Sequence, residues 1–309
     1  MTAPIVILGE ALMDCITQDD GSLLPLMGGS PFNLARAAAL QGGQVGYLSP
    51  FSSDSFGQQL KALCLADGVQ ALSPDSPHPT SLAVVTLRAG QPSYGFYREG
   101  IADRDYSVEQ VLRTLQTLPA GVLHTGSLML VPPEHEKILE VIAGARALGW
   151  TVSIDVNLRP RVAQDLGAYC AAVMQAVELA DWVKASDEDL QILGFAGASL
   201  ESAPELCRRL ARGANRRVAL TFGGSGAYLW VDGAQASAGA PSIRLVDTVG
   251  AGDTFWGSCL ADWAGQPDGA AARVAQTLAR AMKAAAINCE RKGCQPPRLQ
   301  ELAQEETNS

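Results

Sequence analysis

The residues best suited to chemistry lie in one glycine-rich segment, Asp247-Thr248-Val249-Gly250-Ala251-Gly252-Asp253-Thr254-Phe255. An apolar, helix-like stretch follows it, and the glycines allow a sharp turn close to a ligand. The backbone amides of Gly250, Ala251, Gly252 and Asp253 would then lie at a helix start, where free N–H groups and the helix dipole favour an anion. A carboxylate repels a resting phosphate but can accept a proton from a hydroxyl that attacks one. The segment predicts phosphoryl transfer with Asp253 as base; the alternative is an ordinary first-turn acid after a tight turn.

A second polar group follows the first apolar run, residues 5–8, which is typical of a buried strand of a parallel sheet. In such sheets ligands bind beyond the carboxyl ends of the strands. Asp14 lies shortly after this run, and Gly28, Gly29 and Asn33 lie at the start of the first long helix. A carboxylate and an amide can bind vicinal hydroxyls, while glycines admit a ring-shaped ligand. Singly, such residues are also ordinary loop acids and helix residues.

Two further segments could reach a substrate. Asp155, Asn157 and Arg159 follow the strand-like run 151–154, although Asp and Asn are also good turn formers. In the expected strand 93–98, the side chains of Tyr94, Phe96 and Arg98 share one face. This face could close over a hydroxylated or anionic substrate, or it could form half of a homodimer interface.

The elements that must position these residues alternate along most of the chain. Strands are expected at 5–8, 45–48, 122–124, 151–154, 182–184 and 218–221, with an extended run at 243–246, and helices at 32–40, 56–66, 107–118, 133–148 and 166–179. Ser30 and Pro31 are typical of an N-cap and a first helical position. The alternation predicts an α/β fold with a mostly parallel central sheet and helices on both faces. Ribbon-like segments near 15–27 and 81–99 do not fit it and are assigned to a small projecting β-lid of a single domain, residues 1–309.

Composition restricts the class of protein. A chain of 309 residues, 47% of them hydrophobic, can bury a large core, and a net charge of −9 without a Lys/Arg-rich run argues against a nucleic-acid partner. No apolar stretch reaches the ~20 residues of a membrane span, and the amino terminus is typical of a strand rather than a signal peptide. The seven cysteines are scattered and form no Cys-x-x-Cys pair, which favours free thiols and a cytoplasmic location. The three histidines lack ligand spacing, so a His-based metal site or a Ser-His-Asp triad has little support.

Two segments resemble the signatures of one enzyme family. Residues 247–255 resemble the carboxy-terminal signature of the ribokinase-like (PfkB) family of sugar kinases, and Gly28-Gly29-Ser30-Pro31-Phe32-Asn33 resembles its amino-terminal signature. Gly9-Glu10 followed by Asp14 matches the Gly-Glu-x-x-x-Asp start of the family, and Asp155 to Pro160 resembles the Asp-x-Asn-x-Arg loop of its bacterial fructokinases. The resemblance spans Gly9 to about Gly293. It implies a ribokinase-like fold whose lid closes over a sugar and excludes water during transfer of the γ-phosphoryl group of MgATP.

The resemblance also implies roles for single residues. Asp253 would be the catalytic base, and the amides of Gly250, Ala251 and Gly252 would form the anion hole. The residues expected to bind the sugar are Asp14, Gly28, Gly29, Asn33, Asp155, Asn157 and Arg159, and the strand alternation adds Arg98. Those expected to contact ATP are Thr221, Gly223 and Gly226, in a Gly-x-x-Gly loop after a strand, and Ala284.

Two acids are linked by the resemblance to cations. Asp189 lies in a segment that resembles the Asn-x-x-Glu segment of the family, tied to magnesium, but serine replaces asparagine and aspartate replaces glutamate. An N-cap followed by first-turn acids explains these residues equally well. Magnesium is still expected, because ATP is used as its magnesium complex. The counterpart of Asp247 in relatives holds potassium with loop carbonyls near Gly293; the alternative is a carboxylate that caps backbone N–H groups.

The substrate is expected to be D-fructose, phosphorylated to fructose 6-phosphate. A 2-keto-3-deoxygluconate kinase is the main alternative within the same chemistry, ahead of a ribokinase or a nucleoside kinase. A non-catalytic sugar or nucleotide sensor on the same fold is an alternative of another class, although a sensor has no need of the base Asp253.

Overall fold

The computed structural model describes residues 2–88, 91–211, 213, 215–266 and 268–304, and two β-sheets organise them. The central sheet has nine strands in the order β13-β12-β11-β10-β9-β8-β1-β4-β5. Its strands are β1 (Pro4–Ile7), β4 (Gln44–Tyr47), β5 (Gln70–Ala71), β8 (Val122–Gly126), β9 (Thr151–Asp155), β10 (Trp182–Ser186), β11 (Arg217–Thr221), β12 (Ala227–Val231) and β13 (Ala234–Ala238). The strands from β11 to β5 pair in parallel, and antiparallel pairs join β12 and β13 to that edge.

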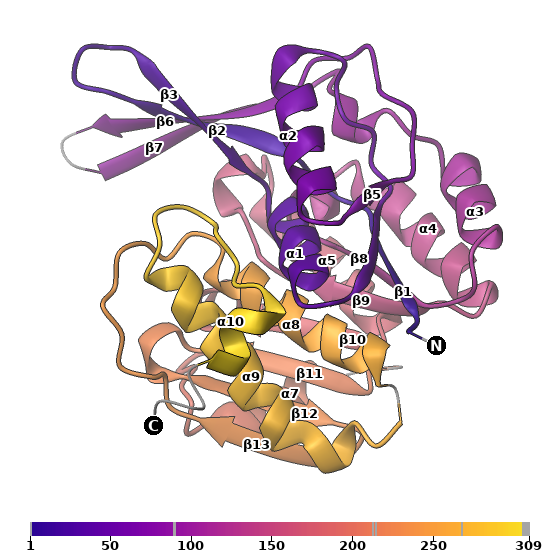
Figure 1. The fold of residues 1–309 in the computed structure, drawn as a ribbon, viewed down its shortest axis with the longest axis vertical. Helices are drawn as coiled ribbons and strands as arrows, with labels where there is room; N and C mark the ends of the chain where they lie inside the picture. Colours follow the sequence, from indigo (N-terminus) through magenta and orange to yellow (C-terminus); the bar gives the residue numbers. More distant parts are fainter. Residues whose placement is uncertain (1, 89–90, 212, 214, 267, 305–309) are drawn as a thin grey trace.

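Helices cover both faces of this sheet (Figure 1). They are α1 (Ser30–Leu40), α2 (Ser55–Ala66), α3 (Val108–Gln116), α4 (His135–Ala147), α5 (Leu166–Leu179), α6 (Asp187–Ile192), α7 (Ala203–Leu210), α8 (Ala251–Gly265), α9 (Val274–Cys289) and α10 (Leu299–Gln304). Short 3-10 turns lie at η1 (Ala102–Arg104), η2 (Ser127–Leu130), η3 (Pro160–Val162), η4 (Gly223–Ser225) and η5 (Ala271–Arg273). The predicted α/β architecture with helices on both faces is confirmed.

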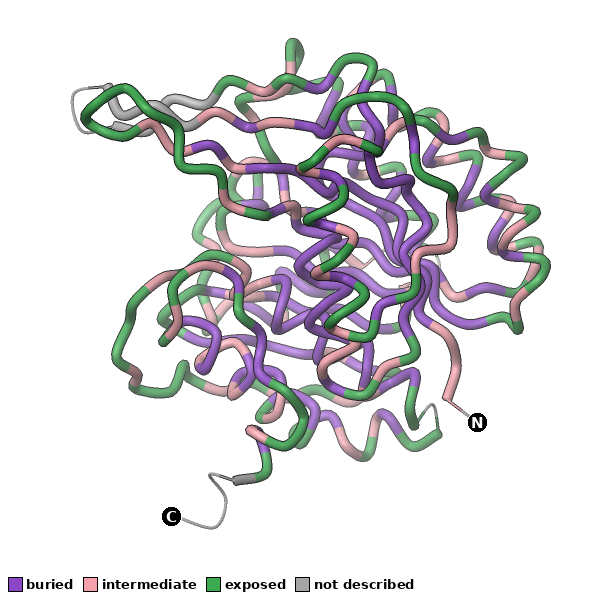
Figure 2. The backbone as a smooth tube through the Cα atoms, turned by 45° about the horizontal axis from the view of Figure 1, so that its top comes forward, coloured by how far each residue is buried: buried purple, intermediate pink, exposed green. Residues whose placement is uncertain are grey.

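Side-chain alternation divides the core into two layers. Val6 and Leu8 pack with the apolar residues of α3, α4, α5 and α7, whereas Ile5 and Ile7 pack with those of α1, α2, α8 and α9. Successive strand residues point to opposite faces, so an uninterrupted apolar run is what a sheet covered on both sides requires. In Figure 2 the buried part of the backbone is concentrated in these central layers.

A second, four-stranded sheet projects from the central body (Figure 1). It contains β2 (Leu12–Thr17), β3 (Leu23–Gly28), β6 (Ser81–Arg88) and β7 (Gln91–Tyr97) in the order β3-β2-β6-β7. Its two chain segments coincide closely with the segments assigned to the lid from the sequence. The expected turn at Ala89 and Gly90 and the side chain of Tyr94 lie outside the described residues.

One local prediction is wrong. Ser30 does not cap α1: Gly29 occupies the N-cap position with φ 109°, and Ser30 is the first helical residue. Its hydroxyl is used elsewhere, because it donates to Asp253. The extended run 243–246 forms no strand within the described chain, and Leu245 and Val246 are exposed. The amides of Val246 and Asp247 instead donate to the Cys289 carbonyl at the end of α9.

Within the same residues, no helix combines the length and apolar character needed to cross a bilayer.

Candidate active site

The carboxyl ends of three neighbouring strands place polar residues at one edge of the central sheet. Asp155, Ser186 and Thr221 are the last residues of β9, β10 and β11, and these strands pair in parallel. Asp253 and Gly252 belong to the first turn of α8, which packs against α1. Gly257 permits that packing, since a Cβ there would lie 2.9 Å from the Leu34 carbonyl oxygen.

The start of α8 has the geometry expected of an anion hole. Gly250, the N-cap, has φ 74°, and a Cβ there would lie 2.2 Å from Cys294 Sγ, so the turn requires glycine. The amide of Ala251 donates to the Thr248 carbonyl at 3.2 Å. The amides of Gly252 and Asp253 have no backbone acceptor among the residues described. The donors left for a ligand are therefore fewer than the sequence predicts.

Asp253 is held by two side chains of α1. Ser30 Oγ donates to Oδ1 at 2.7 Å, and Asn33 Nδ2 donates to Oδ2 at 3.0 Å. Asn157 Nδ2 donates in turn to Ser30 Oγ at 2.6 Å. The side chains of Ser30, Asn33 and Asn157 therefore form one hydrogen-bond network with the Asp253 carboxylate. Burial raises the pKa of Asp253, and the bonds from Ser30 and Asn33 oppose that rise. A carboxylate with a raised pKa is a stronger base than an exposed one, which suits proton abstraction from a hydroxyl.

Lys184 is a component of the site that the sequence analysis missed. Its side chain is 4% exposed, and Nζ donates to both carboxylate oxygens of Asp155 at 2.9 Å. A Cβ on Gly252 would lie 3.2 Å from Nζ, so the ammonium lies beside the first turn of α8. Burial acts to lower the pKa of Lys184, but Asp155, Asp189 and Asp253 together hold it above its ordinary value. This lysine therefore supplies a buried positive charge next to the candidate anion hole.

Asp14 points from the second sheet toward the loop after β9. Burial raises its pKa to about 6, and the positive charge of Arg159 opposes the rise. A Cβ on Gly28 would lie 2.3 Å from Asp14 Oδ2, and one on Gly29 would lie 2.5 Å from the Glu10 carbonyl oxygen. Gly28 thus packs closely on Asp14, and Gly29, with φ 109°, packs on the backbone of Glu10, whatever ligand binds there. The Arg159 guanidinium donates to the carbonyls of Asn157 and Leu158 at 3.4 and 3.1 Å.

Arg98 lies apart from these groups, at the base of the second sheet. The strand β7 ends at Tyr97, and Arg98 is 5% exposed, with its guanidinium 3.4 Å from Asp103 and donating to the Leu128 carbonyl at 3.3 Å. Phe96 differs, because the register Asp14↔Ala83↔Phe96 places it on the same face of the sheet as Asp14. The predicted face is therefore shared by Phe96 and Asp14, while Arg98 is enclosed by protein.

The expected nucleotide loop is only partly open. Gly223 has φ 49°, and a Cβ there would meet no atom within 4 Å, whereas a Cβ on Gly226 would lie 2.1 Å from the Ala238 carbonyl oxygen. Gly223 thus leaves room for a ligand beside Thr221, the last residue of β11, and Gly226 has a structural role. Ala284 on α9 has no exposed surface and packs with Ile287 and Leu302.

The two acids linked to cations are already engaged by protein donors. Asp189 Oδ1 accepts from the Leu158 amide at 2.7 Å, and Oδ2 accepts from the amide and hydroxyl of Ser186 at 2.8 Å, in a capping box at the start of α6. Asp247 accepts from the amides of Val249 at 3.0 Å and Gly293 at 2.8 Å. Both carboxylates therefore act as caps, and within the described chain no group of three or more His, Cys, Asp or Glu side chains is arranged to hold a metal.

Comparison with known proteins identifies the family. The model of the pfkB family carbohydrate kinases matches residues 3–301. The chain belongs to this family. A fructokinase of Vibrio alginolyticus is 32% identical over 271 residues, which cover 84% of this kinase and 86% of that protein. Two solved structures are also similar.

The first is a fructokinase from Xylella fastidiosa with bound ATP, with a TM-score of 0.83, 27% identity and coverage of 99% of this kinase and 100% of that chain. The second is a fructokinase from Vibrio cholerae O395 with fructose, ADP and calcium bound, with a TM-score of 0.82, 27% identity and coverage of 98% of each chain. The kinase is thus a phosphotransferase that acts on an alcohol group, on a ribokinase-like fold.

Proposed function

We propose that this kinase transfers the γ-phosphoryl group of MgATP to D-fructose and forms fructose 6-phosphate. The observation that carries the proposal is the buried Asp253 carboxylate, oriented by Ser30 and Asn33 beside the open amides of the α8 start. The relatives named as fructokinases support the choice of sugar. A non-catalytic sensor would not need a base held in this way.

In the proposed reaction, Asp253 accepts the proton of the sugar hydroxyl as its oxygen attacks the γ-phosphorus of ATP. The amides of Gly252 and Asp253, with the nearby ammonium of Lys184, stabilise negative charge on the transferred group. Asp14 on the second sheet and Arg159 after β9 bind hydroxyls of the sugar. The loop of Thr221 and Gly223 contacts ATP.

Magnesium would enter with the nucleotide rather than through a resident carboxylate site. Asp189 already accepts hydrogen bonds from Ser186 and Leu158. Asp155 is paired with Lys184. When bound to the phosphates of ATP, the ion neutralises part of their charge. Asp189 therefore supports the loop after β9 through the Leu158 amide.

Potassium is the second cation that we propose, next to Asp247. This carboxylate joins the turn before α8 to Gly293, so an ion there would position the anion-hole amides without contact to the sugar. The turnover rate should be higher in potassium than in a bulky organic cation at equal ionic strength. Equal rates in the two buffers would contradict this role.

A substrate panel tests the sugar. We expect D-fructose to give the highest kcat/KM in a panel with 2-keto-3-deoxygluconate, ribose and adenosine. Arg98 is enclosed and paired with Asp103, which leaves Arg159 as the cation near Asp14 that could bind a keto acid. If 2-keto-3-deoxygluconate gives the highest ratio and Arg159→Ala removes its advantage, the kinase acts on that acid and the fructose assignment is wrong.

The variant Asp253→Asn tests the proposed role of this carboxylate as the base. Asp253→Asn keeps the size of the side chain and should lower kcat by about 10²- to 10⁴-fold, or roughly 3 to 5 kcal/mol of barrier, with ATP affinity unchanged. Near-normal turnover in this variant would exclude Asp253 as the base.

The remaining assignments concern the whole molecule. We propose one kinase domain over residues 1–309, with the sheet β3-β2-β6-β7 as its lid. The seven free cysteines support a cytoplasmic location, because they need no oxidising compartment. A homodimer that forms through the lid is the proposed assembly.

A further inference from the structure

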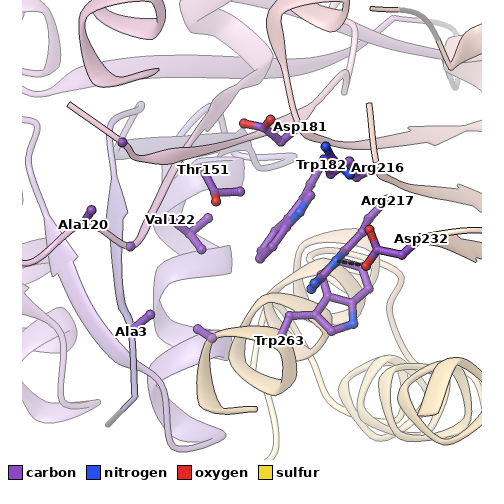
Figure 3. A pocket seen from close by; sticks show the side chains of 13 residues that line it. Ala3, Ala120, Val122, Thr151, Asp181, Trp182, Arg216, Arg217, Asp232 and Trp263 are labelled. Atoms are coloured by element: carbon purple, nitrogen blue, oxygen red, sulfur yellow. Dashed lines mark ion pairs between the residues drawn. The ribbon is translucent and has the colours of Figure 1, made fainter. Parts of the chain in front are cut away.

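A cavity of about 330 Å³ opens at the edge of the central sheet opposite to Asp253. Its wall includes the first residues of four strands, Val122, Thr151, Trp182 and Arg217, together with Ala3 and Trp263 (Figure 3). The candidate active site lies at the last residues of three of these strands, β9, β10 and β11. With a rise of ~3.3 Å per residue, five-residue strands separate the two edges by roughly 13 Å. The cavity is therefore a separate site.

Arg217 is the polar group that gives this cavity its character. The residue is 8% exposed, and its guanidinium carbon lies 4.5 Å from the centre of the Trp182 ring and 4.9 Å from that of Trp263. Its Nε forms an ion pair with Asp232 Oδ2 at 3.4 Å, and Nη1 has no hydrogen-bond partner in the described part of the chain. Buried charged donors without acceptors are costly, so an acceptor supplied by a ligand would stabilise this arrangement.

The charges around Arg217 favour an anion as that ligand. Asp181, which also lines the cavity, is neutralised by an ion pair with Arg146 at 2.9 Å and accepts from the Val152 amide at 2.8 Å. Asp232 is the other acid in the wall; it pairs with Arg217, and the exposed Arg216 also lines the cavity. One positive charge is left over at the mouth of the cavity.

Thr151 and apolar residues form the rest of the wall. Ala3, Val122 and the edges of Trp182 and Trp263, which are 7% and 1% exposed, offer a narrow apolar surface to a ligand. The volume is at the lower end of the range for small-molecule sites. We propose that this cavity binds a small organic anion, a carboxylate or phosphate monoester with a flat apolar body, whose charged group meets Arg217 and Arg216. Its body lies against Ala3, Val122 and the exposed edge of Trp182.

Calorimetric titration with simple probes tests the proposal. Benzoate or phenyl phosphate should bind with a Kd on the order of 1 mM, and the tighter of the two identifies the anionic group. Benzamide has the same body without charge, and inorganic phosphate has charge without the body; each should bind at least tenfold more weakly. Saturating fructose and ATP should leave benzoate affinity unchanged. Displacement by either substrate, equal affinity for benzamide, or equal affinity for inorganic phosphate would overturn the assignment.

Variants locate the binding. Arg216→Gln changes an exposed rim residue outside the proposed catalytic machinery and should weaken benzoate binding about fivefold or more, with kinase activity unchanged. Trp263→Phe should also weaken binding by reducing the apolar wall. Arg113→Gln on the exposed surface of α3 is the matched control and should bind like the wild type. If Arg216→Gln and Trp263→Phe both bind like Arg113→Gln, the probe binds elsewhere and the proposal is wrong.

Discussion

At the scale of single residues, the basicity of Asp253 depends on the donors of α1. Burial alone would raise the pKa of this carboxyl further, and the hydrogen bonds from Ser30 and Asn33 limit the rise. Since only the ionised carboxylate can accept a proton, kcat/KM should fall as the pH falls through this raised pKa. The two donors therefore determine how far the active pH range extends toward acid.

Ser30→Ala tests this dependence. Removal of the hydroxyl takes away a hydrogen bond of 2.7 Å to the charged form, so the acid limb of the kcat/KM profile should move to higher pH by roughly one unit. Ser258→Ala is the matched control, because Ser258 lies on α8, is also buried and donates to Gln41 rather than to Asp253. An unshifted acid limb in Ser30→Ala would show that Ser30 does not influence the base.

The site residues that the sequence predicts belong to local motifs, whereas the one that it missed has partners that are distant in the sequence. Asp253, Gly250 and Asn33 belong to local patterns whose spacing restricts backbone conformation, so the sequence predicts their part of the site. Lys184 belongs to no such pattern, and its partners Asp155 and Gly252 meet it only after the sheet has formed. A lysine within an apolar strand-like run was nevertheless a signal, because lysine is rarely buried without a partner.

At the scale of elements, local signals predict the elements better than their ends. Ser30-Pro31 is a strong helix start by residue type, yet the helix begins one residue earlier because Gly29 with φ 109° takes the cap position. The alternation of Phe96 and Arg98 predicts one shared face, but β7 ends at Tyr97 and Arg98 turns into the core. In both cases a tertiary contact, to Asp253 or to Asp103, outweighs the local preference.

The contact made by Arg98 belongs to a buried charge cluster where the second sheet meets the central body. Glu10, between β1 and β2, is 1% exposed, and burial raises its pKa to about 7, against the charge of Arg98. Asp103 in η1 is buried beside it and adds negative charge. The folded protein thus holds the Glu10 proton more tightly than the unfolded chain does, whose pKa is near 4.5.

The cluster predicts a pH dependence of stability. The stability from Glu10 protonation is fully present below pH ~4.5 and is lost as the pH rises through 7. Glu10→Gln cannot ionise, so its free energy of unfolding should fall less between pH 5 and pH 8, by up to about 3 kcal/mol, in urea titrations. The exposed Glu140→Gln on α4 is the control and should behave like the wild type. The same pH dependence in both variants would contradict a buried, protonated Glu10.

At the scale of the whole molecule, the second sheet has two faces with different surroundings. The strand register places Asp14, Leu24 and Phe96 on one face, which is directed at the candidate active site. It places Leu23, Met27 and Tyr97 on the other face. Leu23, Met27 and Tyr97 are 49%, 37% and 64% exposed. Met13 and Cys15 on the same face are buried, so the apolar side chains that this face exposes lie on the two outer strands, β3 and β7. Exposed apolar side chains on a projecting sheet are typical of an interaction surface. The proposed homodimer would therefore use the face of Leu23, which leaves the face of Asp14 free to cover the sugar.

Two adjacent leucines give a matched test of this assembly. Leu23 and Leu24 are 49% and 40% exposed and point to opposite faces of β3, so a lysine at either position adds the same charge to a different face. By light scattering coupled to size exclusion, the wild type should be a dimer and Leu23→Lys a monomer, because the charge would be buried in the interface. Leu24→Lys should stay dimeric but lose affinity for fructose, since its charge lies on the side of Asp14. A monomeric wild type would exclude the dimer. Dissociation of the dimer by Leu24→Lys but not by Leu23→Lys would show that the interface lies on the face of Asp14 instead.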